Sequence, residues 1–151
     1  SHVLVLPDYG VGIFAFANRT YSGPRAPVWD AAVTMLRAGD LKARPTPVSP
    51  ALATAYAGAI RAFVSGSVAV TNELLAMNLL MDRDAEHRAR DIAALKAEVG
   101  TCDTSAPITA TGALSGEFTW TCATGRVRGD LLLAPTPTPQ IQTLTFSRAT
   151  P

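Results

Sequence analysis

The chain has 151 residues, a net charge of +1, 48% hydrophobic residues and 17% charged residues. This composition provides enough apolar side chains for a core and excludes disorder by composition. No run of basic residues is present, which argues against binding to nucleic acid or to an anionic membrane surface. Residues 68–81 form the most apolar segment, but polar residues interrupt it, so we expect no membrane span.

The chain begins directly with a strand-like run, residues 2–7. We expect it to be part of a longer protein; the alternative is that Ser1-His2 remains from a tag on a short native chain. A second apolar run, residues 11–18, follows the turn Pro7-Asp8-Tyr9-Gly10, and the two runs predict an antiparallel hairpin. Both runs are apolar on both faces, which predicts a hairpin that is covered on both sides.

Residues 1–40 are not expected to form a stable domain alone, because an isolated hairpin is marginal in water. Exposed strand edges favour pairing between copies, so we expect a homodimer or a larger homo-oligomer. A helix is predicted over residues 28–37, between Pro27 and Gly39. Its buried side is expected to comprise Trp29, Ala32, Val33 and Leu36.

A proline-containing segment, residues 43–47, predicts a linker between two domains, residues 1–42 and residues 48–151. Three helices are predicted after it, over residues 50–64, over residues 68–80, and from Asp84 to Gly100. Ser49 is expected to cap the first of them. The expected buried positions are Ala53, Tyr56, Ile60 and Phe63 or Val64 on the first helix, and Ile92, Leu95 and Val99 on the third.

The rest of the chain is strand-like, with runs over residues 116–121, 126–133 and 140–147. Helices followed by a short antiparallel meander predict an α+β fold, in which the helices cover one face of a curved sheet. The period-two pattern predicts that the apolar side chains Phe118, Trp120, Val127, Leu131 and Leu144 face the helices. The alternating polar side chains, Glu117, Arg126, Arg128 and Asp130, are expected to face solvent or a partner.

The motifs of serine hydrolases are missing from this chain. A nucleophilic serine of the β-lactamase type stands three residues before a lysine, but Lys42 and Lys96 have Gly39 and Ala93 at that position. There is also no Lys-Thr-Gly, Tyr-x-Asn, Ser-Asp-Asn or Gly-x-Ser-x-Gly sequence. We therefore predict no catalytic residue in this chain.

Histidine and cysteine offer little further chemistry. His87 with Asp91 is interpreted as a pair on a helix surface, and no cysteine–histidine pattern with metal-ligand spacing occurs. We expect no metal and no cofactor. Cys102 and Cys122 permit one disulfide but do not establish it, and two buried thiols are the alternative.

The first forty residues resemble the end of class C β-lactamases and of their esterase and peptidase relatives. The resemblance lies in a strand that ends at Pro7, a polar turn, a Gly-Ile strand, an Ala-Asn pair at Ala17-Asn18, a tyrosine loop and a final helix. In that family the Lys-Thr-Gly-like strand comes just before this point. The resemblance therefore implies that the catalytic motifs lie upstream, and no catalytic role is assigned to Asn18.

The remaining part resembles an accessory C-terminal domain of some of these hydrolases, with a nuclear-transport-factor-2-like (cystatin-like) cone. The segments that carry this resemblance are Leu80-Met81-Asp82-Arg83, the arginine-rich helix to Gly100, Ala113-Leu114-Ser115-Gly116, and Leu133-Ala134-Pro135-Thr136-Pro137 leading to Ile141-Gln142-Thr143-Leu144. It departs from the full cone in having few strands, so a complete sheet is expected to need a partner chain.

Together these resemblances imply a non-catalytic C-terminal fragment of a β-lactamase, an esterase or a D-amino peptidase. Its partner would be the upstream catalytic domain, and the accessory domain would serve docking or dimerisation. Two alternatives remain open: one half of a split serine hydrolase, or a module that binds a small ligand. The ligand wall would comprise Phe118, Trp120, Val127, Leu131 and Leu144.

The resemblance also bears on the compartment. Hydrolases of this kind act outside the cytoplasm, which implies a periplasmic or secreted protein. Disulfides persist there, so a bond between Cys102 and Cys122 is slightly favoured over two free thiols.

Overall fold

The computed structural model describes residues 1–19 and residues 21–150. The chain divides into two compact units, Ser1–Thr46 and Pro47–Pro151, which we call unit 1 and unit 2 and describe separately. None of the helices in the described part of the chain is long and apolar enough to cross a membrane.

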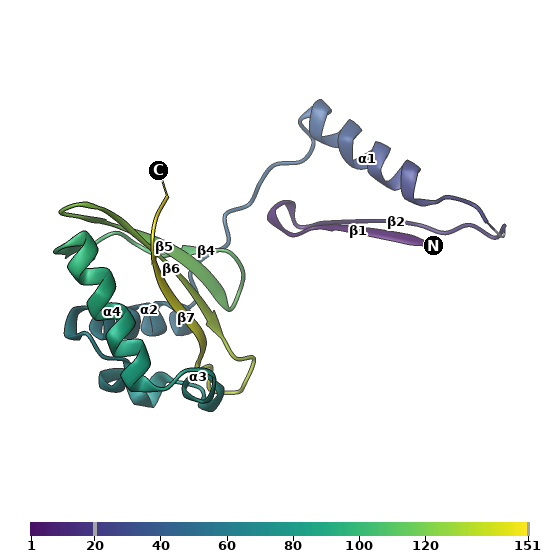
Figure 1. Ribbon diagram of the computed structural model, residues 1–151. Helices are drawn as coiled ribbons and strands as arrows, with labels where there is room; N and C mark the ends of the chain where they lie inside the picture. Colours follow the sequence, from purple (N-terminus) through teal and green to yellow (C-terminus); the bar gives the residue numbers. More distant parts are fainter. Residues whose placement is uncertain (20, 151) are drawn as a thin grey trace. The chain divides into compact units, whose positions relative to one another are not determined.

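Unit 1 contains a two-stranded sheet and one long helix (Figure 1). Strands β1 (His2–Leu6) and β2 (Val11–Ala15) pair antiparallel, and the short turn η1 (Pro7–Tyr9) joins them. Gly10 ends this turn at φ 64°, a left-handed conformation that glycine adopts without steric cost. Helix α1 (Arg25–Ala38) packs on one face of the hairpin and ends at Gly39.

Unit 1 itself covers only one face of the hairpin, so the cover expected on the other face stays a prediction. Burial alternates along β1 and β2, because a single helix covers only one face. The buried side of α1 agrees with the prediction only at Ala32. It contains Val28 and Ala32, whereas Trp29, Val33 and Leu36 are 38–45% exposed.

Unit 2 has helices on one side of an antiparallel sheet (Figure 1). Its helices are α2 (Pro50–Ser65), η2 (Val68–Leu74), α3 (Met77–Asp82) and α4 (Ala85–Val99). Its strands are β3 (Cys102–Asp103), β4 (Thr109–Ala110), β5 (Ser115–Cys122), β6 (Gly125–Leu133) and β7 (Ile141–Arg148). The sheet order is β3-β5-β6-β7, and β4 pairs with the remaining part of the β5 edge. The predicted α+β class is confirmed.

Local sequence signals place two of the helices in unit 2. The Ser49 side chain accepts a hydrogen bond from the Leu52 N–H, which caps α2, and the Asp84 side chain accepts one from the His87 N–H, which caps α4. The predicted stripe of α4, Ile92, Leu95 and Val99, is buried. On α2 the prediction is confirmed for Tyr56 and Phe63, Ile60 is half-buried, and Ala53 is exposed. The buried positions are Leu52, Ala55, Tyr56, Gly58, Ala59, Ala62 and Phe63.

The single helix predicted over residues 68–80 is wrong. The chain forms η2 and α3 there, and the two are separated at Leu75 and Ala76, which are extended. Leu75 forms a parallel bridge with Ile141, and the Ala76 N–H donates to the Ile141 carbonyl. A continuous helix would have to give up these contacts with the start of β7.

Candidate functional site

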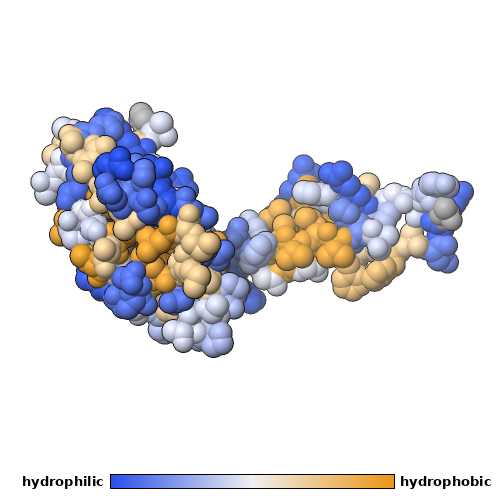
Figure 2. Space-filling view, turned by 60° about the horizontal axis from the view of Figure 1, so that its bottom comes forward, coloured by the Kyte–Doolittle hydropathy of each residue, from blue (hydrophilic) through white to orange (hydrophobic). Residues whose placement is uncertain are grey.

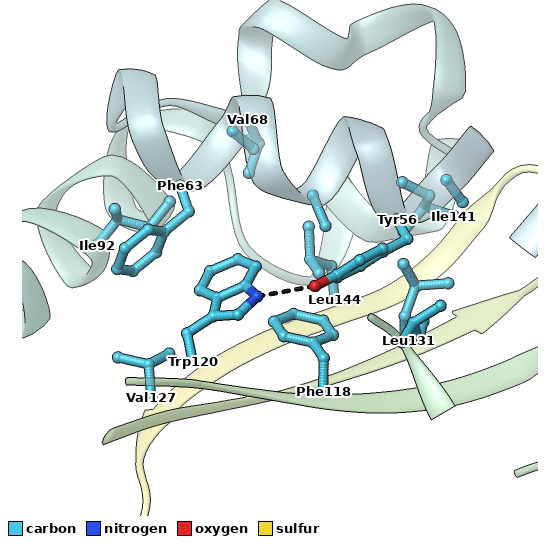
Figure 3. Close-up of a cluster of buried hydrophobic side chains, with 14 of the residues drawn as sticks. Tyr56, Phe63, Val68, Ile92, Phe118, Trp120, Val127, Leu131, Ile141 and Leu144 are labelled. Atoms are coloured by element: carbon cyan, nitrogen blue, oxygen red, sulfur yellow. Dashed lines mark hydrogen bonds between the residues drawn. The ribbon is translucent and has the colours of Figure 1, made fainter. Parts of the chain in front are cut away.

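The five residues predicted to form a ligand wall lie in the core of unit 2. Their side chains are at most 3% exposed and point from the sheet toward the helices (Figure 3). The aromatic rings of Tyr56 and Phe63 on α2 pack against Trp120. The space behind the helices is therefore occupied by the protein's own side chains, and ligand binding by this wall stays a prediction.

A hydrogen-bond chain fixes the centre of this core. The Trp120 Nε1–H donates to the Tyr56 hydroxyl at 2.8 Å (Figure 3). This hydroxyl donates in turn to the Ala106 carbonyl. Burial raises the pKa of the Tyr56 phenol. The indole N–H of Trp120 and the hydroxyl of Tyr56 are thus satisfied by each other and by the backbone, which leaves neither free to orient a ligand.

A pocket of about 310 Å³ lies beside this core, between the start of α4 and the edge strand β7. Four apolar residues line it: Phe146, which is half-buried, and Val68, Ile92 and Leu144, which are 1–3% exposed. Leu144 is thus shared between this pocket and the wall predicted from the sequence. Charged side chains also line the pocket: Asp82, Arg83, Arg88 and Asp91.

Two of these charged side chains neutralise each other. Arg83 donates to both carboxylate oxygens of Asp91, at 2.6 and 2.8 Å. The guanidinium holds the pKa of Asp91 below its ordinary value, and Asp91 in turn raises the pKa of Arg83. The pair was not foreseen: the expected partner of Asp91, His87, instead pairs with the Asp84 carboxylate at 2.8 Å. The reason is that Asp84 caps the same turn and holds the ring close.

Arg88 is held differently, by three backbone carbonyls. Its guanidinium donates to the carbonyls of Leu79 at 2.9 Å, Arg83 at 2.9 Å and Leu144 at 3.2 Å. Burial lowers its pKa, although an arginine of this kind stays charged at neutral pH. Within the described residues, no carboxylate lies within 4.0 Å of this guanidinium, so its charge has no ion-pair partner.

Asp82 carries the opposite unpaired charge. It is exposed at the end of α3, and it has no ion pair or side-chain hydrogen bond among residues 1–19 and 21–150. Its charge is close enough to act on the Arg88 guanidinium. The pocket therefore combines an apolar surface with one unpaired cation and one unpaired anion.

The opposite face of the sheet is polar. Arg128 donates to Glu117 at 2.7 Å and lies 3.4 Å from Asp130. Arg126 is also exposed there. These positions alternate with the buried apolar ones along β5 and β6, as the period-two pattern predicts.

A disulfide joins Cys102 and Cys122, which are direct partners in the antiparallel pairing of β3 with β5. It closes the chain over a sequence separation of 20 residues. It therefore ties the segment after α4 to the end of β5.

No three His, Cys, Asp or Glu side chains in the described part of the chain come together as a group that could hold a metal ion. Comparisons of the chain with protein-family models, with curated proteins and with solved structures find no match.

Proposed function

We propose that this chain is a non-catalytic C-terminal part of a serine hydrolase similar to class C β-lactamases and penicillin-binding proteins. Unit 1 then belongs to the sheet and helix layer of the hydrolase, and unit 2 is a cystatin-like accessory domain. The observation that carries the proposal is the bare outer face of the hairpin. On it, Val3, Val5, Phe14 and Phe16 are 61–76% exposed.

This outer face is a continuous apolar surface. Val3 stands opposite Phe14 in the strand pairing, and the rings of Phe14 and Phe16 lie 5.6 Å apart. Figure 2 shows apolar residues gathered on this unit. Contiguous exposed apolar side chains mark surfaces that bind another protein layer, and an isolated two-stranded sheet is marginal in water. Both properties suit a hairpin that completes a larger domain.

The outer face of the sheet in unit 2 is polar, unlike the apolar outer face of the hairpin in unit 1. A face built from Arg128, Glu117, Asp130 and threonines suits a solvated surface or a wet contact rather than an apolar interface. Unit 1, and not unit 2, is therefore the part that docks on the hydrolase through apolar contacts.

The disulfide of unit 2 supports a periplasmic or secreted location, because such bonds persist in oxidising compartments.

The first test concerns catalysis. The purified chain is expected to hydrolyse neither nitrocefin nor p-nitrophenyl esters, because it has no Ser-x-x-Lys sequence. The reading frame before Ser1 is expected to encode that sequence, and the complete product is expected to be active unless the nucleophilic serine is replaced by alanine. Turnover that stays with the pure chain through purification would contradict the proposal. So would a frame without the motif.

The second test concerns docking. The upstream catalytic domain, expressed as a separate chain, is expected to form a one-to-one complex with this chain in light scattering. The double variant Val3→Thr/Phe14→Thr keeps strand-forming residues but removes apolar surface, and it is expected to abolish the complex. Val33→Thr, at an exposed position of α1, is the matched control and is expected to leave it intact. A homodimer that the double variant abolishes, without any complex with the catalytic domain, would assign the face to a second copy instead.

A further inference from the structure

The pocket between α4 and β7 has the chemistry of a small binding site of its own. Sites for small molecules are concave, mostly apolar, and contain a few placed polar groups. The pocket of about 310 Å³ is lined by the half-buried Phe146 and by the buried side chains Val68, Ile92 and Leu144, together with polar and charged groups. It borders the filled core through Val68, Ile92 and Leu144, and all of its lining residues belong to unit 2.

The charges of this pocket define the kind of ligand that fits. Arg83 and Asp91 satisfy each other through two hydrogen bonds, so neither is available to a ligand without breaking that pair. Arg88 and Asp82 remain, one positive and one negative. A ligand with a single charge would pair with only one of these two side chains, whereas a ligand with one positive and one negative group would pair with both.

The guanidinium of Arg88 is also held in a position in which it can bind an anion. Its three bonds to carbonyls of α3, the α3–α4 turn and β7 hold the guanidinium in place, and they use three of its five N–H donors. The remaining two donors have no hydrogen-bond partner within the described part of the chain. A guanidinium fixed in this way binds a carboxylate without losing much side-chain freedom.

The edge of β7 adds backbone donors next to Arg88. Because the Leu144 carbonyl points to Arg88 and away from β6, the N–H of Leu144 points the same way, and so do the N–H and carbonyl of Phe146 two residues later. These groups lie along the edge that lines the pocket. They can bind the polar end of a small ligand beside the guanidinium.

We propose that this pocket binds a zwitterionic amino acid with an apolar side chain. The carboxylate of the ligand lies on Arg88, its ammonium group lies toward Asp82, and its side chain packs on the half-buried ring of Phe146, next to the buried side chains Val68, Ile92 and Leu144. The proposal goes beyond the role of unit 1 in a hydrolase and does not rest on it, because every residue involved belongs to unit 2.

Leucine is the probe for the test, and the amide resonances of isotope-labelled protein are the readout. Titration with L-leucine or D-leucine is expected to shift the resonances of Ile92 and of residues 144–146, and the better enantiomer reveals the handedness of the site. Leucinamide lacks the carboxylate and 4-methylpentanoate lacks the ammonium group. Each is expected to bind at least about tenfold more weakly, since hydrogen bonds to charged groups are the strongest contacts available here.

Asp82→Asn is the informative variant, because Asp82 is exposed and unpaired within the described residues and its replacement should not disturb folding. It is expected to weaken leucine binding at least about tenfold and to leave the binding of 4-methylpentanoate unchanged or improved. Glu86→Gln, which removes the same charge from the exposed first turn of α4 without lining the pocket, is the matched control and should change neither. The proposal is overturned if neither leucine enantiomer shifts these resonances up to its solubility limit. It is also overturned if Asp82→Asn and Glu86→Gln have equal effects.

Discussion

Gly129 occupies an inward-facing position of β6, between the buried residues Val127 and Leu131. In the strand pairing it stands opposite Phe118, and a Cβ atom at this position would lie 2.1 Å from the Cζ atom of the Phe118 ring. Glycine usually weakens a strand because it has no side chain to pack. Here its missing side chain provides the space in which the Phe118 ring lies.

Gly129→Ala is therefore expected to destabilise unit 2 by about 1–3 kcal/mol, because overpacking forces a core ring to move. Urea unfolding followed by circular dichroism measures the loss. In a Phe118→Leu background the same change is expected to cost clearly less, because the ring that meets the new methyl group is absent. Equal losses in the two backgrounds would show that the Phe118 ring is not the reason for the glycine.

At the scale of an element, the first turn of α4 depends on one carboxylate. The Asp84 side chain accepts hydrogen bonds from the backbone N–H and the ring Nδ1 of His87, at 2.8 Å each. These bonds hold the pKa of Asp84 below its ordinary value of 3.8. A carboxylate with a lowered pKa in the folded state stabilises the fold above its ordinary pKa, and this stabilisation is lost as the pH falls through the lowered value.

Acidification below the ordinary pKa of Asp84 is therefore expected to lower the thermal midpoint of unit 2. Asp91 and Asp103, whose pKa values are also lowered, contribute to the loss in the same window. Asn caps a helix as well as Asp does but carries no titrating group. Asp84→Asn should thus flatten part of the pH dependence measured by scanning calorimetry. If its profile falls as steeply as that of the wild type, Asp84 does not contribute.

The edge of β7 shows how elements far apart in the sequence protect one another. Three of its carbonyls accept hydrogen bonds from the helical side: Ile141 from the Ala76 N–H, Gln142 from the Asn78 amide and Leu144 from Arg88. An uncovered edge would be a template for pairing with another chain. The beginning of the last strand is thus closed by α3 and α4, while its continuation at Phe146 lines the pocket.

At the scale of the whole molecule, the disulfide is the main covalent constraint. Closing a loop of about twenty residues is expected to stabilise the folded state by about 3 kcal/mol, chiefly by restricting the unfolded chain. Cys102→Ser/Cys122→Ser should lose about this much in urea unfolding. Treatment of the wild type with a reducing agent should give the same loss, whereas a fully reduced protein that is as stable as the oxidised one would contradict the prediction.

The two units are expected to differ in autonomy. Unit 2 has a sheet covered by helices and a disulfide, so residues 47–151 should fold alone and unfold cooperatively. Residues 1–46 have one helix on one face of a hairpin and should remain largely unfolded alone. Circular dichroism and amide resonance dispersion of the two separate pieces test this difference. A cooperative transition in the piece 1–46 would contradict it.

Features that depend only on neighbouring residues could be predicted from the sequence. Ser49 and Asp84 could be identified as caps because a cap needs only the next three residues. The inward positions of Trp120 and Val127 could be identified because side chains alternate strictly along a strand. The turn and the two strands of the hairpin also depend on neighbouring residues. The α+β class could therefore be predicted from sequence patterns.

Features that depend on contacts between distant segments could not be predicted from the sequence. Leu75 interrupts the predicted helix because it meets Ile141, and the buried side of α1 depends on how that helix lies on the hairpin. The pocket could not be foreseen either, since Arg88 becomes part of it through a bond to Leu144, 56 residues away. Hydrophobic periodicity describes which face of an element is buried, but it contains no information on which element will cover that face or which charges will meet there.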